Sequence, residues 1–566
     1  MEKDIKYYIY GAGQNIVTVY AWLSSFVQVE GIIDQDESKR GKNICGTEIT
    51  STKTFFERIF QKGRMRIVVS VTQKETLKNI IYNFERRGLI PYADYVLAAD
   101  LCRFSYSQIP GLVSPVHSIS RGYAIKKSCD PKSFLVERDN RIFRVYRNPR
   151  AAEEAKKVLQ CCENAGLFGK YVVESYIPQD VTDFKDQFLI EHEFINSPIS
   201  FCYEWSPALY EEYVYYMLDF AKKLTENELG LIDAHGLNAT LYKGKFVFFD
   251  FGAIKVGRTC GRELYELVET LVLPLILMKV GEMKKAYFYL EDHSILLTLR
   301  DIVGYLTMNQ QCEINHIYEE ITYIDSSEKM ALLIDKIKGF CINFGSYDKN
   351  SEWWDYQDSE WNKTDNREQW SIKMKNVVEM IGNIEPKRII DLAGNQGWYG
   401  SYFHEQVESV VVTDMDLTAL DRLWNRISEK GYSNVLPLKM SICAPSLGRH
   451  YDGFVDGVHL KPIRTDACER FKSDLAIALA IVHHLAFREH LVFNEIISVL
   501  SMYTTRYLLV EFVDSGDRFI TDFIKTDYEW YTKENFEQEL KSKYRILVSR
   551  ESSPSETRTL YLCEKK

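Results

Sequence analysis

The stretch Asp391-Leu-Ala-Gly394-Asn-Gln-Gly397 constrains the fold of this chain more than any other part of its sequence. It follows a short apolar run, residues 388–390, and ~20 residues later a second apolar run, 410–413, leads to Asp414. A strand, a glycine turn, a helix, a second strand and an acid, in this order, are typical of a nucleotide-type cofactor site on a doubly wound parallel sheet. Glycine lets the backbone approach a ligand closely, and the acid can accept hydrogen bonds from two ribose hydroxyls.

The cofactor that this pattern favours is S-adenosylmethionine. A dinucleotide-dependent dehydrogenase is the rival interpretation, but the turn lacks the G-x-G-x-x-G spacing of such enzymes. We therefore predict a methyltransferase-type pocket in the last third of the chain.

Size and composition limit the remaining classes of function. A chain of 566 residues is too long for a single core and predicts roughly three domains. Its formal net charge of −10 offers no electrostatic footprint for nucleic acid. The longest apolar run, 271–278, is too short to span a bilayer, and no signal-peptide core opens the chain. The 12 cysteines include no C-x-x-C pair, so we expect reduced thiols in a cytoplasmic protein.

Two histidines mark a second part of the predicted pocket. The run 473–484 predicts a buried strand that ends in His483 and His484, and a further strand carries Glu511 at the same end. Carboxyl ends of strands in an open α/β sheet face the ligand crevice. A neutral imidazole there could take the proton of a hydroxyl acceptor, whereas an anionic phosphate needs positioning only. We predict that His483 or His484 is a catalytic residue, and that at least one of the pair is buried and hydrogen-bonded to the backbone.

Together these residues resemble the class I S-adenosylmethionine-dependent methyltransferases. More narrowly, the middle and C-terminal regions are similar to a bacterial family of glycan-modification and nodulation-type proteins, in which a degenerate kinase-like region precedes the methyltransferase. The resemblance is carried by an ordered set of blocks: 203–206, 233–238, 391–397, 436–438, 478–485 and 510–513.

The resemblance implies roles for the residues of the glycine loop and for the acids that follow it. Asp391, Gly394, Asn395 and Gly397 would form the part of the site around the methionine half of the cofactor. Asp414 would bind the ribose, with Asp416 as the second choice.

Three further residues next to these blocks are expected to meet the cofactor or to pack nearby. Ser441 stands where the family has an acid that contacts adenine, and its hydroxyl can still accept a hydrogen bond. Trp398 or Tyr399 could face the sulfonium cation, or both could be aromatics that pack a helix.

The middle of the chain contains a second constellation, Asp233 with Asn238, followed by Asp250-Phe-Gly252. Kinases use such residues to accept the substrate proton (Asp233 here) and to hold metal (Asn238 and Asp250 here). No glycine-rich lid precedes them, and Arg144 stands where the strand lysine is expected. Either a phosphotransferase with ATP and Mg²⁺ remains, or the fold is retained for binding and architecture, which we favour.

The N-terminal region opens with Gly11 and Gly13 after a short strand, and Asp34 ends the next strand. This pattern is similar to small Rossmann-like modules attached to sugar-modifying transferases. Ile16 replaces the third glycine and crowds the start of the helix, so the module either binds a nucleotide-type ligand of unspecified identity or is purely structural.

These patterns predict an α/β multidomain protein. We expect a Rossmann-like nucleotide-binding-type domain over 1–108, a protein-kinase-like α+β domain with a helical extension over 116–345, a linker over 346–367, and a Rossmann-like class I methyltransferase domain over 368–566.

The expected function is methyl transfer to a hydroxyl or phosphate oxygen of a bacterial surface glycan or sugar intermediate, within polysaccharide biosynthesis. One alternative is a bifunctional kinase and methyltransferase that makes a methyl-phosphate cap. The other is a pseudokinase and Rossmann scaffold with little catalysis. The identity of the acceptor and the oligomeric state are left open.

Overall fold

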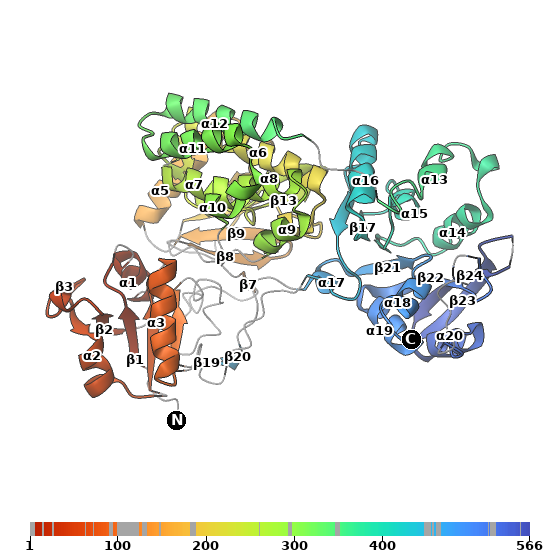
Figure 1. Ribbon diagram of the computed structural model, residues 1–566, viewed down its shortest axis with the longest axis horizontal. Helices are drawn as coiled ribbons and strands as arrows, with labels where there is room; N and C mark the ends of the chain where they lie inside the picture. The colour runs from red at the N-terminus through yellow and green to blue at the C-terminus, as the bar shows by residue number, and fades with distance from the viewer. Residues whose placement is uncertain are drawn as a thin grey trace. The chain divides into compact units, whose positions relative to one another are not determined.

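The computed structural model of the chain separates into two compact units (Figure 1). The first comprises Met1–Leu159, Glu174–Phe194 and Leu447–Thr465, and the second Gln160–Val173, Ile195–Ser446 and Asp466–Lys566. The structure describes residues 6–13, 16–24, 28–62, 64–71, 73–89, 94–98, 124–126, 133–146, 149–181, 188–259, 261–291, 297–345, 351–446, 454–455, 458–459, 466–518, 520, 528–554 and 556–566. The predicted boundary between the first two domains, 109–115, lies outside these residues.

The N-terminal part of the first unit is a six-stranded sheet of order β3-β4-β2-β1-β5-β6. Its strands are β1 (Lys6–Tyr10), β2 (Val29–Asp34), β3 (Asn43–Ile44), β4 (Thr47–Ser51), β5 (Met65–Val69) and β6 (Tyr95–Leu97). All neighbours are parallel except β3 and β4. Helices α1 (Ile16–Ser24) and α3 (Lys74–Arg86) complete the alternating pattern expected from the sequence, whereas β3 and β4 were not predicted. Ile16 is buried in the core, which shows how the position of a third glycine is filled.

A second, antiparallel sheet of the first unit has the order β10-β11-β9-β8-β7. Its strands are β7 (Ala124–Lys126), β8 (Ser133–Arg138), β9 (Arg141–Tyr146), β10 (Ser175–Tyr176) and β11 (Leu189–His192). Helix α5 (Pro149–Asn164) follows β9 in the chain.

The second unit contains a helical region built around α6 (Pro207–Glu226). Proline at the first helical position suits the start of this helix, because its missing N–H would be unpaired there in any case. Two antiparallel strand pairs follow: β12 (Leu229–Leu231) with β15 (Ile254–Val256), and β13 (Ala239–Tyr242) with β14 (Lys245–Phe248). The helices after them include α7 (Gly261–Leu267), α8 (Leu273–Lys279), α9 (Met283–Glu291), α11 (Met308–Thr322) and α12 (Ser327–Ile342).

The C-terminal part of the second unit is a seven-stranded sheet of order β18-β17-β16-β21-β22-β24-β23. Its strands are β16 (Arg388–Leu392), β17 (Ser409–Asp414), β18 (Val435–Lys439), β21 (Ser473–Ala478), β22 (Thr504–Val513), β23 (Tyr544–Glu551) and β24 (Arg558–Lys565). The first five strands in this order are parallel, and β24 runs antiparallel between β22 and β23. The helices that accompany it include α14 (Ile372–Gly382), α15 (Trp398–Ser401), α16 (Leu417–Lys430), α17 (Ala467–Arg470), α18 (Val482–Phe487), α19 (Phe493–Met502) and α20 (Lys533–Lys543).

The segment 351–367, expected to be a linker, is instead packed onto the C-terminal sheet domain. It contains α13 (Asp358–Asn362), and the buried Trp361 donates its indole N–H to the carbonyl of Gln396 at 3.0 Å. The Gln357 side chain accepts from the backbone N–H of Trp398 at 2.9 Å. The sequence suggested a linker because the segment lacks helical or strand periodicity, but its aromatic side chains still supply apolar surface that can be buried.

No helix in the described part of the chain is long and apolar enough to cross a bilayer. Nine cysteines fall within the described residues, and all of them are free thiols.

Candidate functional site

The glycine loop after β16 has a backbone that only small residues tolerate. Gly397 has φ +66°, and a Cβ there would lie 2.8 Å from Val412. A Cβ on Gly394 would lie 2.7 Å from the carboxyl carbon of Asp391. Both distances are shorter than real Cβ contacts, so the two glycines are required for the loop to lie this close to β16 and β17.

Asp414, at the end of β17, joins this loop to the second strand. One carboxylate oxygen accepts the backbone N–H of Asn395 at 2.7 Å, and the other accepts that of Asp416 at 2.8 Å. Burial raises the pKa of Asp414, against the lowering effect of these backbone donors. A carboxylate offers about four acceptor positions, so Asp414 keeps positions for hydrogen bonds from a ligand.

Asp391 lies beneath the loop and is only 2% exposed. Its carboxylate accepts the backbone N–H of Gly400 at 3.1 Å. Burial, aided by the nearby charge of Asp414 and opposed by the Gly400 N–H, raises the pKa of Asp391 to about 7, so this acid titrates near neutral pH.

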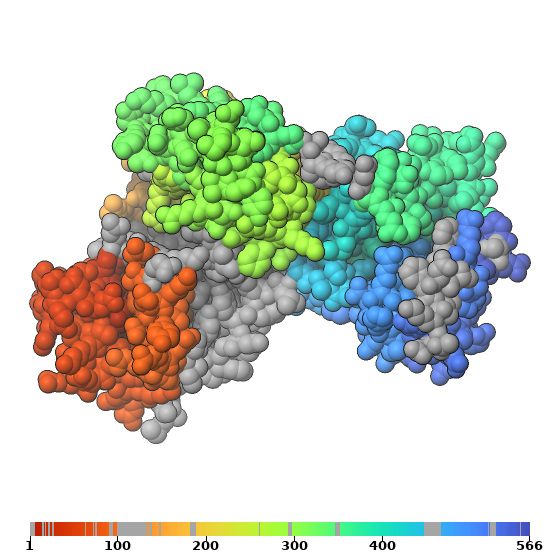
Figure 2. All heavy atoms as spheres, viewed as in Figure 1, coloured from red at the N-terminus to blue at the C-terminus, as the bar shows by residue number. Residues whose placement is uncertain are grey.

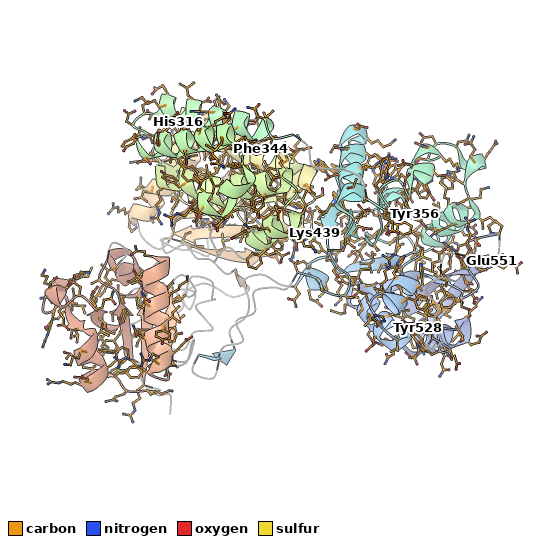
Figure 3. All side chains as sticks on the ribbon, in the orientation of Figure 1. His316, Phe344, Tyr356, Lys439, Tyr528 and Glu551 are labelled. Atoms are coloured by element: carbon orange, nitrogen blue, oxygen red, sulfur yellow. The ribbon has the colours of Figure 1, made fainter. Side chains whose placement is uncertain are left out.

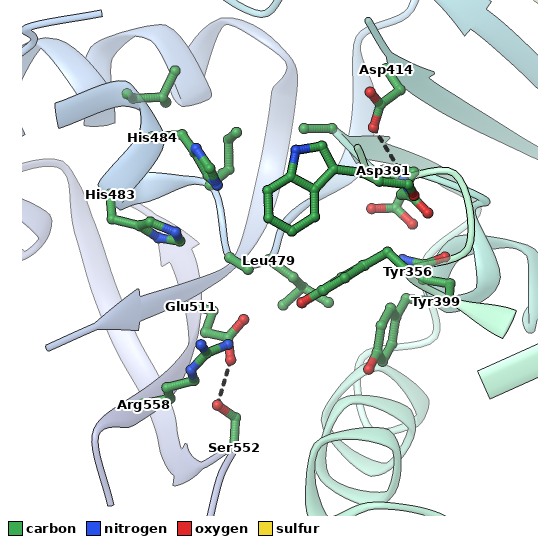
Figure 4. Close-up of a pocket in the computed structure, with 18 of the residues that line it drawn as sticks. Tyr356, Asp391, Tyr399, Asp414, Leu479, His483, His484, Glu511, Ser552 and Arg558 are labelled. Carbon is green, nitrogen blue, oxygen red and sulfur yellow. Dashed lines mark hydrogen bonds between the residues drawn. The ribbon is translucent and has the colours of Figure 1, made fainter. Parts of the chain in front are cut away.

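A cavity of about 1050 Å³ opens at the carboxyl edge of the parallel strands. Asp391 and Asp414 lie on one side of it, His483 and His484 on the other, and Glu511, Ser552 and Arg558 form a third side (Figure 4). Strands β17 and β18 are added on one side of β16, and β21 and β22 on the other, so the strand order reverses between β16 and β21. The cavity opens at this switch point, which is the usual position of a cofactor site in an open α/β sheet. The order of the seven strands, with β24 inserted antiparallel, decides the fold. The C-terminal domain is a class I methyltransferase fold.

Comparisons with known proteins agree with the resemblance expected from the sequence. Nodulation protein NoeA of Rhizobium meliloti (strain 1021) is 25% identical over 408 residues, which are 67% of this chain and 82% of NoeA. No family model matches the chain.

Similar solved structures include N-methyltransferase NodS from Bradyrhizobium japonicum WM9 and the bifunctional kinase-methyltransferase WbdD. NodS is 10% identical with a TM-score of 0.25, and the match covers 37% of this chain and 98% of NodS. For WbdD, a structure at 15% identity has a TM-score of 0.25 and covers 34% of this chain. That match spans only 39% of the WbdD chain, less than half its length.

The cavity of the methyltransferase domain brings together most of the residues predicted for it. Those that line it are Asp391, Gly394, Asn395, Asp414, Ser441, His483, His484 and Tyr399. Ser441 also accepts the backbone N–H of Ala444 at 3.1 Å.

Three predicted residues have other positions. Asp416 caps helix α16, because one carboxylate oxygen accepts the N–H groups of Thr418 and Ala419 while the other accepts the Ser351 hydroxyl. Trp398 is 1% exposed and packs edge-on against Trp370, so it is a core aromatic rather than a cofactor contact. Gly397 faces Val412 and Leu423 and does not line the cavity.

The two histidines begin a helix and do not end a strand. Strand β21 stops at Ala478, and α18 begins at Val482, so the apolar run spans a strand, a turn and a helix start. His483 is 6% exposed, and its Nδ1 has no hydrogen-bond partner in the described part of the chain. Burial, with the neighbouring His484 and Arg558, lowers the pKa of His483 to about 3, so the imidazole is neutral at physiological pH.

The side of the cavity away from the glycine loop contains ion pairs that the sequence patterns did not reveal. Lys373 on α14 lies 2.6 Å from Glu511 on β22, and Glu511 is fully buried. The Ser552 hydroxyl also donates to Glu511. Arg558 forms a two-pronged ion pair with Asp517, at 2.8 and 3.0 Å. Only Glu511 had a sequence signal, because its strand was recognisable, and its partner Lys373 lies 138 residues earlier.

The kinase-like constellation lies next to the strand pairs β12–β15 and β13–β14. Asn238 donates its side-chain amide to the carbonyl of Asp233 at 3.4 Å, and the Asp250 carboxylate accepts the N–H of Gly252 at 3.1 Å. The Asp233 side chain is 54% exposed and lies 3.8 Å from His235. Among the described residues, no group of three or more His, Cys, Asp or Glu is arranged to hold a metal ion. Arg144 belongs to the first unit, where it is buried on β9 and donates to the Ser133 hydroxyl at 3.0 Å.

The N-terminal module repeats the arrangement of an acid and a loop seen around Asp414. The Asp34 carboxylate accepts the N–H of Ala12 at 2.6 Å and that of Asp36 at 2.8 Å. Here, however, the Lys39 ammonium also lies 3.2 Å from Asp34. Gly11 has φ +105°, and a Cβ there would lie 2.5 Å from Val71, whereas the exposed Gly13 is uncrowded. The acid of this module is therefore paired with a cation, whereas no lysine or arginine among the described residues pairs with Asp414.

Proposed function

We propose that the cavity binds S-adenosylmethionine and that the chain transfers its methyl group to a polar acceptor. The observation that carries the proposal is Asp414, a strand-end carboxylate with acceptor positions left beside a glycine loop that lies against the cavity. Asp391 adds a second carboxyl beneath the same loop, which suits the cationic amino group of this cofactor. When bound, the cofactor supplies an electrophilic methyl group.

The acceptor that the cavity fits best is a neutral hydroxyl. The neutral His483 imidazole can accept a hydrogen bond from a hydroxyl and orient it, whereas its pKa of about 3 makes it a weak base for the hydroxyl proton. The cations Lys373 and Arg558 are already paired with carboxylates, so an anionic phosphate would have to compete with Glu511 and Asp517. These contacts support the hydroxyl of a glycan or sugar intermediate over a phosphate. The resemblance to glycan-modification proteins supports a bacterial surface glycan.

Binding of the cofactor should depend on pH through Asp391. Its ionised form attracts the cationic cofactor, and its pKa of about 7 makes that form scarce at pH 6. We expect the dissociation constant of S-adenosylmethionine to fall about tenfold between pH 6 and pH 8. Titration calorimetry across this range measures it, and Asp391→Asn should bind with a flatter pH profile. A wild-type chain that binds no S-adenosylmethionine at any pH would refute the proposed function.

The same carboxyl affects the stability of the ligand-free domain with a definite sign. The pKa of Asp391 is raised in the folded state, above an unfolded value of about 3.9. Its contribution to the free energy of unfolding is therefore complete below about pH 4 and is lost as pH rises through 7.

A second candidate function, phosphorylation by the middle domain before methylation, rests on the ordered set Asp233, Asn238 and Asp250. If it holds, Mg²⁺-dependent ATP binding should be measurable by calorimetry and should disappear in Asp250→Ala. Asp219→Ala is a suitable control, since Asp219 pairs with Lys338 on a helix surface. Absence of ATP binding by the wild type would remove the methyl-phosphate alternative and leave an architectural role for this domain.

A further inference from the structure

One wall of the cofactor cavity is formed by residues 439–446, here called the wall segment, which runs from the end of β18 toward α17. Four of its residues line the cavity: Met440, Ser441, Ile442 and Cys443. Its position decides the shape of the cavity beside Asp414, since Met440 donates its backbone N–H to the carbonyl of Asp414 at 3.0 Å.

The wall segment begins on a contact with the helical middle region of the same unit. The Lys439 ammonium lies 4.0 Å from the centre of the Tyr287 ring and 3.4 Å from the Glu291 carboxylate, both on α9. Figure 3 shows Lys439 at this junction. The Tyr287 hydroxyl in turn donates to the carbonyl of Trp205 at 2.7 Å. This end of the segment is therefore held by the middle region.

The far end of the wall segment is held by a buried carboxylate of the middle region. Glu204 is 1% exposed, and it accepts hydrogen bonds from the Ser446 hydroxyl and from two guanidinium nitrogens of Arg470 on α17. It also accepts the backbone N–H of Phe201 at 3.0 Å. The backbone N–H of Ala467 donates to the carbonyl of Ser446 at 2.9 Å. One carboxylate thus joins three separate stretches of chain.

The middle of the segment is anchored within the methyltransferase domain itself by the Tyr503 hydroxyl, which donates to the carbonyl of Ile442 at 2.7 Å. Helix α6 of the middle region also contacts helix α16 of the methyltransferase domain. The Asp421 carboxylate accepts the N–H of Ala208 at 2.9 Å, and the Trp424 indole donates to Glu212 at 2.7 Å. In the space-filling view the yellow-green atoms of the middle region adjoin the cyan atoms of the methyltransferase domain (Figure 2).

We propose that Glu204 and Arg470 are positioning residues for the cofactor, through which the kinase-like region fixes the wall segment in its binding shape. A wall that is already ordered spares the cofactor the entropic cost of ordering it, so affinity depends on these anchors. The kinase-like region would then contribute to methyl transfer without any phosphotransfer of its own. This inference rests on the proposed binding of S-adenosylmethionine.

The test compares Glu204→Gln and Arg470→Lys with the wild type in the full chain. Glutamine keeps the shape of Glu204 but loses its charge, and lysine keeps the charge of Arg470 but loses the two-pronged geometry. Calorimetry should show that both variants bind S-adenosylmethionine and S-adenosylhomocysteine roughly tenfold more weakly. With an acceptor in hand, KM for the cofactor should rise while kcat at saturating cofactor stays near the wild-type value.

Lys338→Gln is the control, because it breaks an ion pair with Asp219 inside the middle region and far along the chain from the wall segment. It should leave cofactor affinity unchanged. If Glu204→Gln and Arg470→Lys melt at a lower temperature but bind the cofactor as tightly as the wild type, the two residues are merely structural and the inference is overturned. If the wild type itself does not bind, the proposed function fails instead.

Discussion

Replacing Asp414 by alanine is expected to weaken binding of S-adenosylmethionine and S-adenosylhomocysteine by at least about a hundredfold. Each hydrogen bond from a ligand hydroxyl to this carboxylate is worth ~1.5–3 kcal/mol, and every ~1.4 kcal/mol is a factor of ten. The variant also removes the acceptor for the backbone N–H of Asn395, so the glycine loop loses its tie to β17. Titration calorimetry with both ligands measures the loss.

Two further variants separate binding from folding in this experiment. Asp414→Asn keeps one oxygen for the loop but loses the charge, so it should bind more tightly than alanine and more weakly than the wild type. Asp416→Ala removes the cap of α16 and should lower stability by about 1 kcal/mol while the dissociation constant stays near the wild-type value. Equal loss of binding in the alanine variants at 414 and 416 would contradict the assignment of Asp414 to the ribose.

Replacing Lys373 by methionine is expected to destabilise the methyltransferase domain by ~3–5 kcal/mol, the usual cost of leaving one member of a buried ion pair alone. Glu511 is fully buried, and without the ammonium it keeps only the Ser552 hydroxyl among the partners described above. Scanning calorimetry measures the effect in the transition that S-adenosylhomocysteine shifts, since a multidomain chain does not unfold in one step.

The loss of stability caused by Lys373→Met should be largest near neutral pH and smaller in acid. In the native protein burial alone would raise the pKa of Glu511, but Lys373 holds it below the ordinary value. Its stabilisation is therefore present above an unfolded pKa of about 4.3 and lost as pH falls through the folded pKa. In the variant, burial raises the pKa, so protonation relieves the buried charge and the difference from wild type shrinks in acid.

Two controls accompany this variant. Adding Glu511→Leu to Lys373→Met should recover most of the lost stability, because no uncompensated charge remains. Lys541→Met breaks an exposed ion pair with Glu537 in the same domain and should cost about 0.5 kcal/mol or less. A single variant at Lys373 as stable as the one at Lys541 would show that the buried pair does not stabilise the domain.

The part of the cavity around the glycine loop could be predicted from the sequence because its residues lie close together in the chain. Asp391, Gly394 and Asn395 are neighbours in one loop, and Asp414 follows at the end of the very next strand. Strand length and glycine spacing therefore suffice to place them at one edge of a sheet. The kinase-like residues Asp233 and Asn238 were recognisable for the same reason.

The ion pairs in the other half of the cavity could not be predicted, because tertiary packing assembles them from distant elements, although Glu511 itself was expected at a strand end. Lys373 comes from α14, Glu511 from β22 and Arg558 from β24. No spacing rule connects them. Helix and strand ends were also misjudged where an apolar run continues through a turn, as it does from Ala478 to His483.

The segment packed ahead of the C-terminal sheet has a consequence for how this enzyme can be divided. Trp353 and Tyr356 line the cavity, although both precede the first strand and helix of the sheet domain. A fragment begun at residue 368 would contain every strand of the sheet but would lack these two aromatic walls, and it would lose Glu204 as well. A fragment meant to keep the whole cavity therefore has to begin before Trp353, and one meant to keep the Glu204 contacts has to include the helical region as well.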